Sequence, residues 1–187
     1  MPIPVAAPII IIWCGVTKIF CFSDETYFIV YENNKEIKKK ITEIKSNDMV
    51  LVYNGKEKKY AEILRNTKIE GNHEFFVIKM KNNSGQKKEI KVTGDHVMIT
   101  FDHNKEINLM NAKDLKGNEF IDTEDGLYQI YEINKEYKDN KYFLIVKGGV
   151  VYANGIFIST VCSKDKAKII KPTSEQWQNF QEIKNIN

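Results

Sequence analysis

The stretch Lys18–Tyr27, Lys-Ile-Phe-Cys-Phe-Ser-Asp-Glu-Thr-Tyr, places one cysteine, Cys21, among aromatic and hydroxyl-bearing residues. A second stretch far downstream, Val92–Val97 (Val-Thr-Gly-Asp-His-Val), supplies a hydroxyl at Thr93 and an imidazole at His96. A thiol, a hydroxyl and an imidazole are the groups needed to break a peptide bond by acyl transfer. The two stretches together are therefore the candidate site of this chain.

The composition of the chain predicts one mostly β domain with a solvated surface. Of its 187 residues, 42% are hydrophobic, which is enough for one sizeable core. Val, Ile, Tyr and Phe are interrupted by Asn-Gly and Asp-Gly pairs, which favours strands and hairpins. The net charge is only +3, and Lys and Glu alternate, whereas a nucleic-acid-binding protein gathers its basic residues on one face. We expect a monomer with no nucleic-acid partner.

Cysteine and histidine usage argues against a disulfide framework and against a metal site. Three cysteines, Cys14, Cys21 and Cys162, cannot all pair with one another, so at least one thiol is expected. This favours a reducing intracellular compartment. No His and Cys residues have metal-ligand spacing, and the sequence contains neither a glycine-rich phosphate loop nor a Gly-x-Ser-x-Gly elbow. We expect no metal and no cofactor.

The two ends of the chain differ in composition from the part between them. Ile3–Val16 is apolar, but it is too short for a membrane-spanning helix of about 20 residues and lacks the basic start of a signal peptide. It predicts a strand over Ile9–Trp13 and no membrane span, with a membrane-associating or extraneous leader as the alternative. Near the other end, Thr173 and Gln176 at capping-box spacing predict a short helix. The expected parts are an upstream segment, a domain and a polar C-terminal segment, at 1–17, 18–162 and 163–187.

Runs of β-branched and aromatic residues, bounded by turn residues, predict the strands of the domain. They lie at Tyr27–Tyr31, Asp48–Tyr53, Phe75–Met80, Glu89–Thr93, His96–Thr100 and, as a hairpin turning at Asn154-Gly155, Gly149–Thr160. Asn154-Gly155 is also prone to succinimide formation, but its position between two strands fits a structural turn better. Lys59–Ile69 fits either a strand or an amphipathic helix.

An internal repeat indicates two related halves. Thr42–Val50 is echoed by Lys113–Ile121: Lys45 and Asn47 of the first copy recur as Lys116 and Asn118 of the second, and apolar and acidic positions match in character. Self-similarity on this scale favours a duplication, with chance in a chain rich in Lys and Asn as the alternative.

The candidate site could carry out an N-to-S acyl shift at the Phe20–Cys21 bond. Cys21 would attack the Phe20 carbonyl to give a thioester, and His96 would donate a proton to the departing nitrogen as a general acid. The Thr93 hydroxyl could hold the amide or the oxyanion. Each residue also has a structural interpretation, because a cysteine before Phe is often a core residue and a threonine at a strand end is ordinary.

The ordered set of motifs resembles the Hint superfamily, the hedgehog/intein autoprocessing domains. Cys21–Thr26 and Ile41–Val52 are similar to the opening of these domains, Thr93-Gly94-Asp95-His96 to their Thr-x-x-His block, and Tyr142–Ile158 to their closing strands. The pattern is most similar to the bacterial-intein-like and von Willebrand-associated branches. The resemblance covers 18–162 and implies an all-β, pseudo-twofold fold of two interlocked halves. It also implies a single-turnover reaction on the chain's own flanking segments, with water, a thiol or an amine as acceptor.

Departures from the family pattern shape the expected reaction. Inteins usually close with His-Asn before a Cys, Ser or Thr, whereas Ser159-Thr160 stand there in this chain, followed by Val161-Cys162. We therefore expect cleavage at the amino-terminal junction rather than standard splicing. Ser159, Thr160 and Cys162 are candidates for a second nucleophile or a C-terminal junction, and Cys162 is equally a candidate for a buried thiol. Phe143 stands where family members carry an acidic residue, so hedgehog-type sterol transfer is not expected.

Two functions of different class remain. The first is autocatalytic self-processing with Cys21 as the nucleophile. The second is a binding or scaffold module that keeps the Hint fold but has lost activity. A cysteine hydrolase acting on other proteins would need an open cleft and turnover in trans, and nothing in the sequence indicates it.

Overall fold

The computed structural model describes residues 21–53, 58–104, 106–147 and 150–160. Within them the chain is built from strands and two short 3₁₀ turns, so the all-β prediction is confirmed. The expected strand at Ile9–Trp13, the expected helix beginning at Thr173, and the residues Cys14 and Cys162 lie outside the described part. No helix among the described residues is long and apolar enough to cross a membrane.

Eleven strands are described, and they form one extended hydrogen-bonded system. The bounds are β1 (Tyr27–Glu32), β2 (Lys35–Lys40), η1 (Ile41–Glu43), β3 (Met49–Tyr53), β4 (Lys58–Lys81), β5 (Lys87–Thr93), β6 (Val97–Phe101), β7 (Ile107–Asn111), η2 (Ala112–Asp114), β8 (Phe120–Thr123), β9 (Gly126–Val146), β10 (Val150–Ala153) and β11 (Ile156–Ser159). The segment 59–69 lies within β4, where the residues up to Glu62 pair with β3 and those from Ile63 pair with β9, so its helical alternative is wrong.

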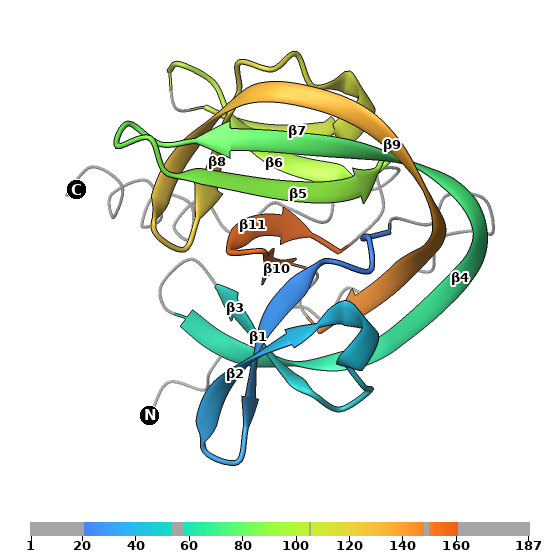
Figure 1. The fold of residues 1–187 in the computed structure, drawn as a ribbon. Helices are drawn as coiled ribbons and strands as arrows, with labels where there is room; N and C mark the ends of the chain where they lie inside the picture. The colour runs from blue at the N-terminus through green and yellow to red at the C-terminus, as the bar shows by residue number, and fades with distance from the viewer. Residues whose placement is uncertain (1–20, 54–57, 105, 148–149, 161–187) are drawn as a thin grey trace.

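The chain is folded as two halves with the same order of elements. β1, β2, η1, β3 and β4 correspond to β6, β7, η2, β8 and β9 (Figure 1). In each half the first strand pairs antiparallel with the second and with the third, and the third pairs with the fourth. The predicted duplication is therefore confirmed by the pairing pattern.

The acidic residue that recurs in the two copies of the repeat has the same structural role in each half. In the first half the Asp48 carboxylate accepts a hydrogen bond from the backbone N–H of Lys45 at 3.0 Å. In the second half the Glu119 carboxylate accepts one from the backbone N–H of Lys116 at 2.7 Å, and two more from the next two N–H groups. The acidic position of the repeat thus satisfies the backbone donors of the turn that follows each 3₁₀ segment.

β4 and β9 are long strands that run through both halves and join them. They pair antiparallel from Ile63 and Val146 at one end to Lys81 and Gln129 at the other. The register shifts three times along this ladder, and such irregularities bend a strand. Figure 1 shows the two strands curving together around one side of the molecule, with β1–β3 at one end and β5–β8 at the other.

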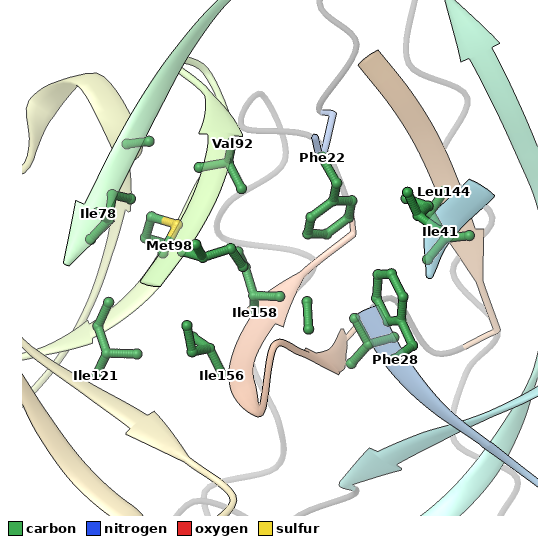
Figure 2. Packing of buried hydrophobic residues seen from close by; sticks show 14 of the residues in the cluster. Phe22, Phe28, Ile41, Ile78, Val92, Met98, Ile121, Leu144, Ile156 and Ile158 are labelled. Carbon is green, nitrogen blue, oxygen red and sulfur yellow. The ribbon is translucent and has the colours of Figure 1, made fainter. Parts of the chain in front are cut away.

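The main core lies between the two halves and is closed by the β10–β11 hairpin. Figure 2 shows Ile156 and Ile158 of β11 beside two groups of buried side chains, and each group includes residues of both halves: Ile78 of β4 lies with Met98 and Ile121, and Leu144 of β9 lies with Phe28 and Ile41. One group includes Phe22 and Phe28, whose rings are 5.6 Å apart in an edge-to-face arrangement. The residue that follows Cys21 is therefore a core residue.

Candidate functional site

The segment that carries Cys21 is held by backbone hydrogen bonds from β5 and β9. Phe22 exchanges two hydrogen bonds of 2.9 Å with the backbone of Tyr142 in β9. The N–H of Ser23 donates to the Lys91 carbonyl of β5 at 3.2 Å. Because both strands contribute, two distant parts of the sequence fix the position of Cys21.

Thr93, the last residue of β5, contacts both backbone polar groups of Cys21. Its N–H donates to the Cys21 carbonyl at 3.0 Å, and its hydroxyl oxygen accepts a hydrogen bond from the Cys21 N–H at 3.1 Å. The second bond is to the nitrogen of the Phe20–Cys21 peptide bond. Of the two positions that the sequence left open for this hydroxyl, the structure shows the one at the amide.

A tight turn brings His96 back towards Cys21. The N–H of His96 donates to the Thr93 carbonyl at 2.9 Å, and the carbonyls of Gly94 and His96 accept from the first two residues of η2 at 2.9 and 2.8 Å. A Cβ atom at Gly94 would lie 2.8 Å from the ring of Phe76, so only glycine fits there without displacement of the ring. Hydrogen bonds from η2 and the close approach of Phe76 to Gly94 thus fix the turn that joins Thr93 to His96.

The imidazole of His96 is completely buried beside the backbone of Cys21. One ring nitrogen, Nε2, is 2.7 Å from the Ser159 carbonyl oxygen, and because a carbonyl only accepts, Nε2 carries a hydrogen. Burial lowers the pKa of His96 to about 4, while hydrogen bonds with the backbone of Ser159 and of Cys21 act in the opposite direction. The ring is therefore neutral at pH 7, with the edge-to-face ring of Phe22 at a centroid distance of 4.7 Å.

The thiol of Cys21 is also completely buried, and it is protonated at rest. Burial raises its pKa to about 12, while the positive charge of Lys141 acts to lower it. Reactive cysteines that attack outside substrates are exposed and have a lowered pKa. The geometry thus fits a thiol that reacts with a group already inside the fold.

The closing strand β11 brings Ser159 and Thr160 to the site from far along the chain. Ser159 contacts His96 through its backbone carbonyl, and its side chain is fully buried. The hydroxyl of Thr160 is buried and has no hydrogen-bond partner among the described residues. Of the three candidates for a second nucleophile, Ser159 contacts His96 and Thr160 is buried next to it in the chain. The third, Cys162, lies outside the described part.

Asn154 at the tip of the β10–β11 hairpin is held as a structural turn, as expected. Asn154 and Gly155 have left-handed φ angles of 52° and 71°, which is typical of the turn in a two-residue hairpin. The Asn154 side chain accepts from the Tyr27 N–H at 2.9 Å and donates to the Glu89 carbonyl at 3.0 Å. Both ends of the side-chain amide are therefore engaged, which opposes attack on it by the following nitrogen.

A polar cleft of about 550 Å³ opens beside Thr93. Its walls come from β4, the Thr93–His96 turn, η2 and β9; they include Phe76, Gly94, Asp95, Lys113, Lys135 and Lys141. Within the described chain no group of three or more His, Cys, Asp or Glu side chains is arranged to hold a metal ion.

Lys141 and the Ser159 carbonyl are parts of the site that the sequence did not reveal. A carbonyl leaves no mark in the sequence, because every residue carries one. Lys141 is one of 28 basic residues, most of them on solvated faces, so its type gave no signal. Its position two residues before Phe143 on one strand, and hence on the same face, is the one clue that could have singled it out.

No protein-family model matches the sequence, and no curated protein sequence matches it. Solved intein structures do match the fold. The gp41-1 intein is 22% identical with a TM-score of 0.58, covering 75% of this chain and 98% of that one. The DnaB intein from Synechocystis sp. PCC 6803 is 18% identical with a TM-score of 0.60, covering 75% and 97%. An intein from a hyperthermophile is 14% identical with a TM-score of 0.62, covering 75% and 99%.

This likeness establishes the architecture of the chain. The described strands have the Hint fold that inteins share, as the sequence predicted. Sequence identities this low show only that the fold is shared. The narrower resemblance to the von Willebrand-associated branch stays a prediction.

Proposed function

We propose that this chain, which has the Hint fold of inteins, cuts its own backbone once at the Phe20–Cys21 bond. The Cys21 sulfur attacks the Phe20 carbonyl carbon, a C–S bond forms, the C–N bond breaks, and the thiol proton ends on the released nitrogen of Cys21. The thioester then passes its acyl group to water, a thiol or an amine. The observation that carries this proposal is the hydrogen bond from the Cys21 N–H to the Thr93 hydroxyl, across 72 positions of sequence.

Thr93 and His96 contact the backbone of Cys21, whose nitrogen must gain a proton when the Phe20–Cys21 bond breaks. Once the C–N bond weakens, the nitrogen of Cys21 acquires a lone pair and needs a donor. The Thr93 hydroxyl is 3.1 Å from this nitrogen, and His96 is engaged with the same residue's backbone.

The pKa values of the pair favour proton transfer that accompanies the attack. With pKa values of about 12 for Cys21 and about 4 for His96, both groups are uncharged at rest. Forming a separated thiolate and imidazolium would cost on the order of 10 kcal/mol. In this proposal His96 takes the thiol proton only as the nitrogen of Cys21 becomes able to receive it, so that neither charged form accumulates.

A folded but inactive module is the second candidate function. The observation that favours it is the buried Cys21 thiol with its raised pKa, together with Ser159-Thr160 in place of His-Asn at the closing strand. Such a module would use its surface for binding, and its buried Cys21 would be a core residue.

The two candidates differ in the fate of a fusion protein. A reporter is joined ahead of residue 1 of the full chain, and intact mass is followed over hours with and without a small thiol. Self-processing predicts a new species that begins at Cys21, absent in Cys21→Ala and retained in the matched control Cys14→Ala. Thr93→Val should slow its appearance at least tenfold, and Thr93→Ser should restore most of the rate. A fusion that stays whole under reducing conditions, while its circular dichroism shows the β fold, would leave the inactive module.

A further inference from the structure

We propose that the cleft beside Thr93 admits the acceptor of the acyl group, and that Lys141 makes this cleft select an acceptor with a negative charge. The ligand class is a small thiol or amine that carries a carboxylate or sulfonate. This inference rests on the proposed function, because a thioester at Cys21 must form before any acceptor can take it.

The cleft has the size and the location for such an acceptor. Its volume of about 550 Å³ is within the range of small-molecule sites. Thr93 forms part of its wall and at the same time binds the backbone of Cys21, so the cleft borders the residue that holds the reacting cysteine. Its polar lining fits a charged acceptor better than an apolar one.

Two of the three lysines that line the cleft form ion pairs. Lys113 binds Asp95 at 2.6 Å, and Lys135 binds Glu74 at 3.1 Å while lying over the ring of Phe76. Two further polar groups of the cleft are engaged through neutral partners: Asp114 accepts from the Asn111 amide at 3.1 Å, and a ring nitrogen of His73 is 3.2 Å from the Glu70 carbonyl.

Lys141 differs from the other two lysines because it forms no ion pair within the described chain. Its charge is held close to the reacting residue by the backbone: the next residue, Tyr142, is bonded to Phe22 by two hydrogen bonds of 2.9 Å. The charge of Lys141 also acts on the thiol of Cys21, where it opposes the larger rise in pKa that burial causes. Among the described residues, Lys141 and Asp114 are thus the two charged side chains of the cleft that form no ion pair, and Lys141 is the one whose charge acts on the thiol of Cys21.

The transfer step places negative charge where Lys141 can act on it. The acceptor thiolate attacks the Phe20 carbonyl carbon, a new C–S bond forms, the bond from that carbon to the Cys21 sulfur breaks, and Cys21 leaves as a thiolate that is then protonated by water. A second anionic group on the acceptor would interact with Lys141 while the acceptor is bound. A single half-buried charge of this kind changes a rate about threefold to tenfold at low ionic strength.

The test compares three thiols of different charge on the full reporter fusion. 2-Mercaptoethanesulfonate is anionic, 2-mercaptoethanol is neutral and cysteamine is cationic; each is used at the same thiolate concentration, and each rate is divided by its rate with a small model thioester. We expect the sulfonate to act about threefold to tenfold faster than cysteamine in 20 mM salt, and the ratio to approach one in 1 M salt.

Substitutions of Lys141 and Lys147 test whether the preference for an anionic thiol comes from the charge of Lys141. Lys141→Gln should remove the ranking and Lys141→Glu should invert it, whereas Lys147→Glu, just beyond the end of the same strand and outside the cleft, should keep it. Cleavage that shows no ranking, or a ranking unchanged in Lys141→Glu, would overturn this inference and leave the proposed function standing. Absence of cleavage with all three thiols would overturn the proposed function as well.

Discussion

At the scale of single residues, His96 owes its properties to burial rather than to its neighbours in sequence. Its three-residue spacing from Thr93 could be read from the sequence, and so could its approach to Cys21 through the family resemblance. Its pKa could not, because the groups that pack against the ring, the Phe22 ring and the Ser159 carbonyl of β11, come from distant parts of the chain. The sequence indicated a general acid near neutrality, and the structure shows a ring that is neutral at pH 7.

His96 should make the stability of the fold depend on pH. Its pKa is about 4 in the folded chain and about 6.5 for an unperturbed histidine, so between these pH values the unfolded chain binds more protons. The stabilisation is complete above pH 6.5 and is lost as pH falls towards 4, by about 3 kcal/mol in total. Urea unfolding at pH 7 and pH 4.5 should show this loss in the wild type and a smaller one in His96→Gln. An equal loss in both would contradict the assignment to His96.

At the scale of elements, the hairpins were the most predictable part of the fold. The β4–β5 and β10–β11 hairpins carry their turn residues and their alternating apolar runs in the sequence. The lengths of β4 and β9 were not predictable, because the middle of each strand is polar and is stabilised by pairing with the other. The segment 59–69 shows the same limit: its composition permits a helix, and only its pairing with β3 and β9 selects a strand.

Asn154 should be the most sensitive position of the β10–β11 turn. Asn154→Gly keeps the left-handed backbone but leaves the Tyr27 N–H without its partner, which should cost about 1–3 kcal/mol. Asn154→Ala should cost roughly 1 kcal/mol more, because alanine also disfavours a positive φ. Chemical denaturation measures both, with Asn33→Gly in the exposed β1–β2 turn as the control that changes little. Equal stability of Asn154→Gly and wild type would show that the side-chain bonds contribute nothing.

At the scale of the whole molecule, the two halves depend on each other. Each half contributes one long strand to the β4–β9 ladder, and the core is lined by both halves and closed by β11 (Figures 1 and 2). The repeat in the sequence indicated the duplication, and the family resemblance indicated interlocking. The pairing partners of β4 and β9 lie too far apart in sequence for local pattern to reveal them.

Fragments of the chain should therefore fold only together. A cut in the turn between β6 and β7 gives fragments 1–104 and 105–187, with Cys21, Thr93 and His96 in the first and Lys141 in the second. Each fragment alone should lack the β-sheet signal in circular dichroism and show poor dispersion in NMR spectra. An equimolar mixture should recover both, because the β4–β9 ladder forms across the cut. A stable β fold in either isolated fragment would contradict the interdependence.

Full burial of the Cys21 sulfur also bears on how long the uncleaved chain lasts. Peroxides and alkylating reagents consume accessible thiolates, and a protonated sulfur that water does not reach escapes both. The precursor can then persist under oxidative stress without loss of its nucleophile. Its lifetime would be governed by how often the segment around Phe22 detaches from β5 and β9, so labelling by iodoacetamide would report the frequency of that opening.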